Sequence, residues 1–232
     1  MMLTTCGNPK TLAAPRTFVR ECWPLILPLA FGAIGFTPIA ALALTMFGLW
    51  SLPVGAMILI VPGVIVAVAL GLAFPRYGRF ALEGHAAGLV AVLVYDAIRW
   101  TFVSLGLWDD FIPNIGGLLN GTGQPDWLLG YGFRWLGDGG GMGLAFVVAA
   151  RVLAPSVSRR SALLVGVAYG LGIWLCLIVT LVAAPLGQTV LFPLTPLTLV
   201  ETCIGHIAYG AVLGDVLART RVSRNPVWAT AR

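Results

Sequence analysis

Hydrophobic residues are grouped along this chain in long runs, and short polar or turn-forming stretches separate one run from the next. At a rise of 1.5 Å per residue, a helix needs about 20 apolar residues to cross a hydrocarbon core about 30 Å thick. Six runs reach that length. We therefore predict an all-α polytopic membrane protein with a bundle of six transmembrane helices, at about 22–47, 51–74, 84–108, 127–151, 161–186 and 196–218.

The positions of the basic residues indicate how these helices are oriented, because cytoplasmic loops near span ends collect Lys and Arg. The connections at 48–50, 109–126 and 187–195 contain neither residue, whereas the terminal segments and the other two connections do. Both termini are therefore predicted to be cytoplasmic. The basic residues on that side are Lys10, Arg16, Arg20, Arg76, Arg79, Arg151, Arg159, Arg160, Arg219, Arg221, Arg224 and Arg232.

The composition excludes a soluble protein, because only 10% of the 232 residues are charged, against about a quarter in a soluble domain. The net charge of +5 is explained by the orientation of the helices, so no nucleic-acid partner is expected. A single lysine beside abundant Ala, Gly, Val and Leu hints at a GC-rich bacterial genome, and thus at a bacterial inner membrane. We divide the chain into a cytoplasmic segment (1–21), a six-helix transmembrane domain (22–218) and a basic cytoplasmic tail (219–232).

Two basic residues, Arg99 and Arg134, lie inside the predicted spans. A charge at the centre of a membrane helix costs about 2.5–3.5 kcal/mol on insertion scales, so such residues usually pair inside the bundle and mark functional positions. Asp96 precedes Arg99 by three residues and Asp138 follows Arg134 by four, so each pair shares a helix face. The third and fourth helices are each predicted to hold an ion pair.

The sixth helix adds Glu201 and His206, which are five residues apart and point about 140° away from each other. Counted along each helix, three helices contribute one residue near the midplane and one nearer the outer surface. Because two arginines face three carboxylates, we hypothesise that His206 or one carboxylate holds a proton. Ion pairs that only hold helices in register are the alternative. The predicted ligand or proton site consists of Asp96, Arg99, Arg134, Asp138, Glu201 and His206.

Glycines four residues apart fit the small-xxx-small pattern of close helix packing. The run at 139–141 also fits a locally unwound helix whose free backbone groups line a cavity, and the sequence leaves both interpretations open. The spaced pairs are Gly166 with Gly170, Gly210 with Gly214, Gly137 with Gly141, and Gly139 with Gly143.

The longest outer connection, 109–126, is expected to be a solvated loop, with an acidic mouth that attracts cations as the alternative. It contains Asp109, Asp110 and Asp126. The tryptophans deep in the spans are expected to be core residues or walls of a ligand cavity: Trp100, Trp135 and Trp174.

No metal site or cofactor is expected. The chain has no HExxH, nucleotide loop, nucleophile motif or cofactor fingerprint. Its four cysteines form no CxxC pair, and His85 and His206 lie at different levels of the predicted bilayer.

Three stretches resemble an uncharacterised family of bacterial multi-pass inner-membrane proteins with a YDxxR helix, a glycine-rich helix and a closing GHxxYGxxLG helix. They are AAGLVAVLVYDAIRW, GYGFRWLGDGGGMGLAFVVAA and GHIAYGAVLGDVLA. The resemblance covers roughly the last two thirds of the chain. It implies a bacterial inner membrane and no particular activity, and Arg134 stands about where a histidine is common in that pattern.

Three function classes remain. The first is a transporter-like protein that binds a small molecule or protons. The second is an accessory subunit of a larger membrane complex, and the third is a membrane-embedded enzyme that acts on a lipid or isoprenoid with a carboxylate or His206 as acid or base. The expected partners are the lipid bilayer, a small-molecule or lipid ligand, and another membrane protein or a second copy of the chain. The sequence does not identify the ligand.

Overall fold

The computed structural model describes the backbone of residues 15–153 and 158–219 and the side chains from Leu25 onward, and these residues form helices and connections without any strand. The α-helices are α1 (Pro15–Gly35), α2 (Thr37–Met46), α3 (Leu52–Gly55), α4 (Val61–Ala73), α5 (Pro75–Ser104), α6 (Ile112–Leu119), α7 (Trp127–Gly132), α8 (Gly140–Leu153), α9 (Arg159–Ala183), α10 (Gly187–Val190) and α11 (Pro196–Arg219). Two π-helical segments, η1 (Ala56–Ile60) and η2 (Phe133–Gly139), join α3 to α4 and α7 to α8.

Five of the described helices are long and apolar enough to cross a membrane, and a bent pair makes a sixth if it counts as one span. The prediction of an all-α fold with several helices long and apolar enough to span a membrane is therefore confirmed. The five are Leu52–Ala73, Pro75–Ser104, Trp127–Leu153, Arg159–Ala183 and Pro196–Arg219, and the pair is Leu25–Gly35 with Thr37–Met46.

The bend of 47° in the first predicted span has a cause in the sequence. Pro38 has no N–H to donate to the carbonyl of Ile34, and its ring excludes a regular turn there. The Thr37 hydroxyl donates to that carbonyl oxygen instead, at 2.7 Å. The helix therefore bends at Phe36 without leaving the carbonyl of Ile34 unpaired.

The third span begins earlier than predicted, at Pro75 and not at residue 84. Proline is favoured in the first turn of a helix because its missing N–H would be unpaired there. The intervening residues include Arg76, Arg79 and Glu83, which end the hydrophobic run without ending the helix. Hydropathy locates the apolar part of a helix, and α5 extends beyond that part.

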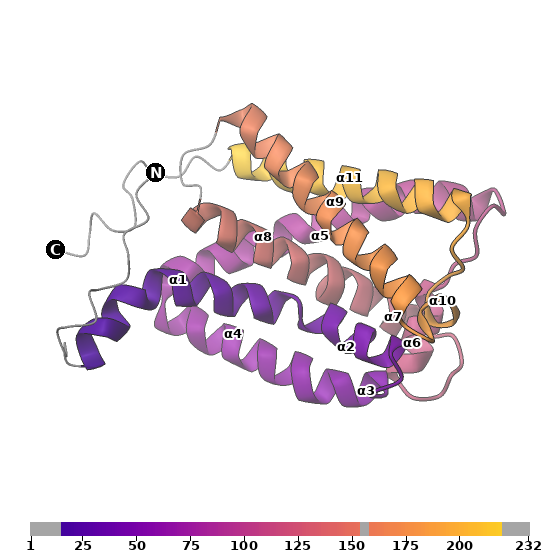
Figure 1. Cartoon of the computed structure of the whole chain (residues 1–232), viewed down its shortest axis with the longest axis horizontal. Coiled ribbons are helices and arrows are strands. Elements are labelled where there is room, and N and C mark those ends of the chain that lie inside the picture. The colour runs from indigo at the N-terminus through magenta and orange to yellow at the C-terminus, as the bar shows by residue number, and fades with distance from the viewer. Residues whose placement is uncertain (1–14, 154–157, 220–232) are drawn as a thin grey trace.

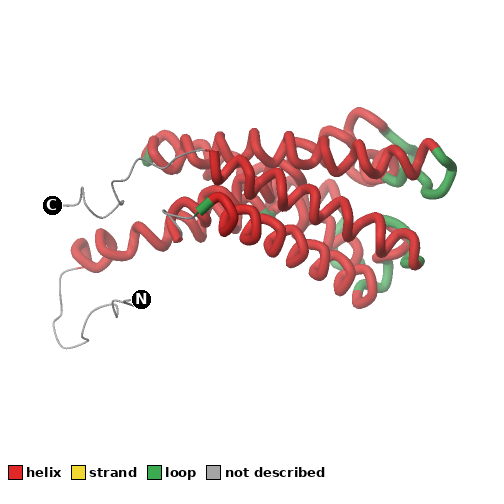
Figure 2. The backbone as a smooth tube through the Cα atoms, turned by 90° about the horizontal axis from the view of Figure 1, so that it is seen from above, coloured by secondary structure: helices red, strands yellow, loops and turns green. Residues whose placement is uncertain are grey.

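The long helices lie side by side, so the bundle has two distinct ends (Figures 1 and 2). The short helices α3, α6 and α10 lie at one end, which we call the loop end. The start of α5, the end of α8, the start of α9 and the end of α11 lie at the other, the basic end (Figure 1). These helix ends carry Arg76, Arg79, Arg151, Arg159, Arg160 and Arg219. The side chains of the other basic residues predicted on this side lie outside the described residues: Lys10, Arg16, Arg20, Arg221, Arg224 and Arg232.

Helix α8 packs closely on two sides through its glycines. On one side, a Cβ at Gly88 of α5 would lie 3.0 Å from the Cα of Gly143. On the other side, a Cβ at Gly141 would collide with the carbonyl oxygen of Gly35 in α1. Because α7, η2 and α8 follow one another as continuous helix, the unwound interpretation of the run at 139–141 is wrong. The glycines serve close packing.

The glycine pairs of α9 and α11 pack against each other, as predicted. A Cβ at Gly166 would lie 2.8 Å from the Cα of Gly214, and a Cβ at Gly170 would lie 3.2 Å from the Cα of Gly210. Backbones that meet this closely leave no space for side chains between them. The glycine pattern therefore holds α11 directly against α9.

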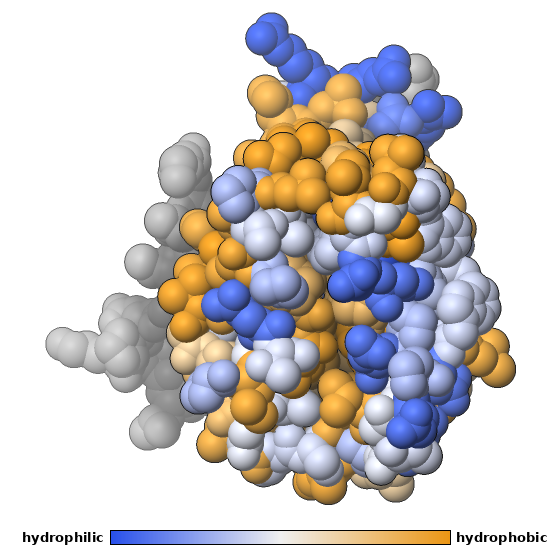
Figure 3. Space-filling view, turned by 90° about the vertical axis from the view of Figure 1, so that its right-hand side faces the viewer, coloured by the Kyte–Doolittle hydropathy of each residue, from blue (hydrophilic) through white to orange (hydrophobic). Residues whose placement is uncertain are grey.

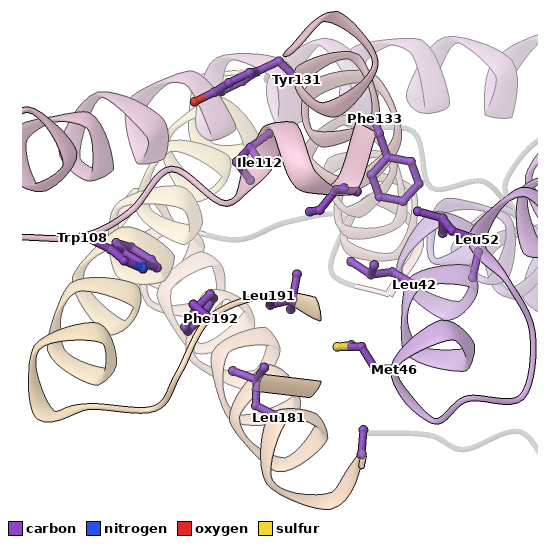
Figure 4. Packing of buried hydrophobic residues seen from close by; sticks show 13 residues of the cluster. Leu42, Met46, Leu52, Trp108, Ile112, Tyr131, Phe133, Leu181, Leu191 and Phe192 are labelled. Atoms are coloured by element: carbon purple, nitrogen blue, oxygen red, sulfur yellow. The ribbon is translucent and has the colours of Figure 1, made fainter. Parts of the chain in front are cut away.

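An apolar cluster fills the loop end between α2, α6, α9 and the segment that follows α10 (Figure 4). The rings of Trp108 and Phe192 meet edge to face with centroids 5.0 Å apart. Ile112 and Ile115 of α6 are buried in the same cluster. Tyr131 is buried in the same cluster.

The predicted solvated loop at 109–126 is therefore only partly a loop, because its apolar residues form α6 and join this cluster. Its tip is exposed: Asn120 donates to Asp126 at 3.2 Å, and Asp126 also accepts from the backbone N–H of Leu129 at 3.0 Å as the cap of α7. Figure 3 looks onto the loop end and shows hydrophilic residues on part of this face beside hydrophobic ones.

Candidate functional site

Asp96 joins the two predicted ion pairs into one cluster. One of its carboxylate oxygens lies 3.4 Å from Nε of Arg99 and also 3.4 Å from Nε of Arg134, and the other accepts from the indole N–H of Trp135 at 2.8 Å. Arg134 also pairs with Asp138, at 2.7 Å. The predicted pairs within each helix are thus present, and Asp96, whose side chain is 0% exposed, connects α5 to η2.

Arg99 has a second carboxylate partner, Asp110, at 2.9 Å. The Tyr131 hydroxyl accepts from both Arg99 and the Trp100 indole and donates to Asp110 at 3.0 Å. The sequence interpretation of Asp110 as an ordinary loop acid is therefore wrong. It lies eleven residues beyond Arg99, and only the turn into α6 brings it back onto α5.

The π-helical segment η2 explains how two adjacent residues reach one carboxylate. Neighbouring side chains of a regular α-helix diverge by about 100°. The wider turn of a π-helix changes these directions, and such turns are common at functional sites. Within η2, Arg134 and Trp135 both contact Asp96, and Asp138 still pairs with Arg134.

Glu201 lies beside this cluster and is unpaired. Its side chain is 0% exposed, and neither carboxylate oxygen has a hydrogen-bond partner within the described residues. The charges of Arg99, Arg134 and Asp96 act on it, although no described cation lies within ion-pair distance. Burial of an unpaired, ionised carboxylate costs free energy. The ion pairs of the cluster therefore do not account for the burial of Glu201.

His206 joins the cluster through Tyr95. The two rings meet edge to face with centroids 5.1 Å apart, and the Arg134 guanidinium carbon lies 4.6 Å from the centroid of the Tyr95 ring. His206 Nδ1 lies 2.7 Å from the carbonyl oxygen of Thr202. Because a carbonyl only accepts, Nδ1 carries the hydrogen, and Nε2 of the neutral ring remains an acceptor.

The six predicted site residues thus gather where α5, η2 and α11 meet. A cavity of about 460 Å³ lies beside them. Apolar side chains of α2, α6 and α9 form most of its lining, and the polar lining residues are Tyr95, Arg134, Asp138, Tyr169, Thr180 and His206. Asp96, Arg99 and Glu201 do not line the cavity.

The Arg134–Asp138 pair faces the cavity, where 13% and 17% of these side chains are accessible. The deep tryptophans, by contrast, act as hydrogen-bond donors and do not line this cavity. Trp135 donates to Asp96, Trp100 to Tyr131, and Trp174 to the Thr202 hydroxyl at 3.0 Å. Two further residues of this region were not predicted from the sequence: Tyr131, which accepts from Trp100, and Tyr95. Each lies within four residues of a predicted site residue.

Within the described residues, no group of three or more His, Cys, Asp or Glu side chains is arranged to hold a metal ion. Cys176 lines the cavity and Cys203 does not, and neither forms a disulfide. Comparison of the chain with protein-family models, with curated proteins and with solved structures finds no match.

Proposed function

We propose that this chain is a six-span bacterial inner-membrane protein that binds a small molecule in a transporter-like manner, within the cavity beside its polar cluster. In this proposal both termini are cytoplasmic, and the chain belongs to the multi-pass family that its YDxxR, glycine-rich and GHxxYGxxLG helices resemble. The ligand would place its polar part against Arg134, Asp138 and His206 and its apolar part along α2 and α9.

The observation that carries the proposal is the accessible ion pair at the cavity wall. An ion pair that only holds helices in register has no need of open space beside it. Ligand sites are typically cavities of about 300–1,000 Å³, mostly apolar, with a few placed polar groups. The cavity of about 460 Å³ beside Arg134 and Asp138 has that character.

The proposed orientation is supported by the basic end of the bundle. The positive-inside rule assigns the side rich in arginine to the cytoplasm. Apart from Arg99 and Arg134, the described arginines lie at the ends of α5, α8, α9 and α11 that form this end (Figure 1). The loop end would then face the periplasm.

A role as accessory subunit is the second candidate, because the span Leu52–Ala73 is only 6% buried within its most apolar window. In α4 only Gly63 is buried. A helix this exposed faces either lipid or another membrane protein. This exposed face is compatible with both proposals, whereas the accessible cavity favours ligand binding.

Thiol accessibility tests the proposed ligand site. Single cysteines are introduced into a chain that lacks its native cysteines, and a charged, water-soluble methanethiosulfonate is applied to membranes. We expect modification of Asp138→Cys and His206→Cys, which line the cavity, and protection of Asp96→Cys. Ala91→Cys, at a buried position on α5 away from the cavity, is the protected control that leaves the cluster intact. Protection at all four positions would contradict a ligand cavity and favour a structural or subunit role.

A further inference from the structure

We propose that the cavity selects an amphiphile whose polar head is a protonated amine, bound at Asp138. This inference rests on the proposed function and names the class of ligand. It follows from two independent features: the charge balance of the ion-paired cluster, and the hydrogen-bonding character of the cavity wall.

The ion-paired cluster carries one uncompensated negative charge. Three carboxylates, Asp96, Asp110 and Asp138, pair with only two guanidinium groups, Arg99 and Arg134. Excess charge that is largely buried is costly unless an opposite charge approaches, and the accessible fractions of the Asp96, Asp110 and Asp138 side chains are 0%, 27% and 17%. A monovalent cation at this cluster would balance it.

Asp138 is the carboxylate that a ligand in the cavity can reach. Asp96 is fully buried, and Asp110 lies at the loop end against Arg99. Only one oxygen of Asp138 accepts from Arg134, and no other described group donates to this carboxylate. Because Asp138 lines the cavity and is 17% accessible, its second oxygen is available to an ammonium N–H.

The other polar groups of the wall are mainly acceptors, and the Tyr95 hydroxyl can both donate and accept. Tyr169 donates its hydrogen to the carbonyl oxygen of Met142 at 2.8 Å, and Thr180 donates its hydrogen to a backbone carbonyl at 2.7 Å. Nε2 of neutral His206 is likewise an acceptor. Arg134 is the cation among the described lining residues, and Asp96 and Asp138 already accept from it. A head group with several N–H donors fits this wall better than a carboxylate or sulfate.

The remainder of the cavity fits an apolar tail. Leu42 and Met46 of α2 point toward Leu191 (Figure 4), and all three line the cavity. The rings of Phe36 and Phe111 also line it, and aromatic faces attract cations as well as apolar groups. The arrangement therefore separates a charged head at η2 from a hydrocarbon tail along α2.

Matched probes with one tail and three heads test the proposal: octylammonium, octanol and octyl sulfate. The full-length chain, with Cys176 as its single cysteine, is placed in lipid nanodiscs, and the rate of Cys176 modification by N-ethylmaleimide is measured. Leu175→Cys in a chain without Cys176 is the matched control, because Leu175 is exposed on the same helix and does not line the cavity.

We expect octylammonium to slow modification of Cys176, but not of a cysteine at 175, at about a tenfold lower concentration than octanol or octyl sulfate. In the Asp138→Asn variant, the preference for octylammonium should disappear. If that variant does not fold, the comparison of the three probes in the chain with Asp138 still tests the proposal. Equal or better protection by octanol or octyl sulfate would overturn the amine assignment and leave the ligand cavity standing. No protection of Cys176 by any probe would also overturn it, and the accessibility of positions 138 and 206 tests the cavity separately.

Discussion

Asp96 links the two arginines of the cluster, since two guanidinium groups and one indole converge on a carboxylate that is fully buried. Removal of one member of a buried ion pair is costly because the other member remains charged and desolvated. At Asp96 a single change would take one charged acceptor from Arg99, Arg134 and Trp135, while Asp110 and Asp138 remain as counter-ions.

We therefore expect Asp96→Asn to lower the free energy of unfolding by about 1–3 kcal/mol, because three donors around this buried position lose a charged acceptor. The measurement is thermal unfolding of purified protein in a mild detergent. Asp109→Asn is the matched control, because Asp109 is exposed and lies next to a cluster residue in sequence. Equal stability of the two variants would show that Asp96 does not hold the cluster together.

Glu201 is the cluster residue whose charge the structure leaves unpaired. Two arginines already face the carboxylates Asp96, Asp110 and Asp138, so a fourth charged carboxylate would double the excess negative charge. We expect Glu201 to hold the proton that the sequence hypothesis assigned to His206 or a carboxylate. Infrared spectra at neutral pH should show a protonated carboxyl band that Glu201→Gln removes and Asp109→Asn retains. A spectrum with every buried carboxylate ionised would refute this expectation.

The charged residues of the site could be predicted from sequence because a charge inside an apolar run is conspicuous and costly. Asp110 could not, since its role depends on the chain folding back through α6. Trp135 and Tyr131 were also beyond prediction as hydrogen-bond partners. Their side chains are as common in a core as in a polar site, and only the geometry of α7 and η2 directs them to the cluster.

At the scale of elements, close backbone contact determines the position of α8. Its glycines face α5 on one side and α1 on the other, so η2, at the start of α8, is held beside Asp96. A side chain at these contacts would separate the helices and displace the site.

We expect Gly88→Ala to destabilise the protein, because a Cβ there would collide with the carbonyl oxygen of Gly139 and approach the backbone of Gly140 and Gly143. Gly32→Ala is the control: no atom lies within 4 Å of its Cβ position, and alanine favours a helix over glycine by about 1 kcal/mol. Thermal unfolding in detergent should show a lower midpoint for the first variant and an equal or higher one for the second. The opposite order would contradict the packing of α8.

The spans themselves could be predicted from hydropathy, since each must be long and apolar to cross a bilayer. The irregularities of these helices were harder to predict from the sequence. The bend before Pro38 follows from proline chemistry, because Pro38 lacks the N–H that a regular helix needs there. The π-helical segment η2 has no comparable signal, because wide turns depend on the packing of neighbouring helices as well as on the glycines in them.

At the scale of the whole molecule, the basic end and the loop end differ in chemistry (Figures 1 and 3). Arginines lie at the ends of four helices on one side, while apolar packing and short helices close the other. Between these ends, large apolar side chains such as Leu72, Leu128 and Leu164 are exposed. This is the surface that a bilayer would cover.

Reporter fusions test the proposed orientation. A fluorescent protein that matures only in the cytoplasm should be active when fused after residue 232, and a phosphatase active only in the periplasm should work when inserted at Gly121. If the two reporters are exchanged between these positions, neither should be active. Activity of the phosphatase at the C-terminus would reverse the orientation of the bundle.

The central claim is that the cavity between η2, α2 and α9 holds a ligand, and native mass spectrometry from mild detergent tests it most directly. The unaltered chain should retain a bound small molecule. Ile173→Trp, which fills the cavity, should lose it, and Leu175→Trp on the outer face of the same helix should keep it. A bare monomer in all three spectra, or the same adduct in all three, would contradict the claim.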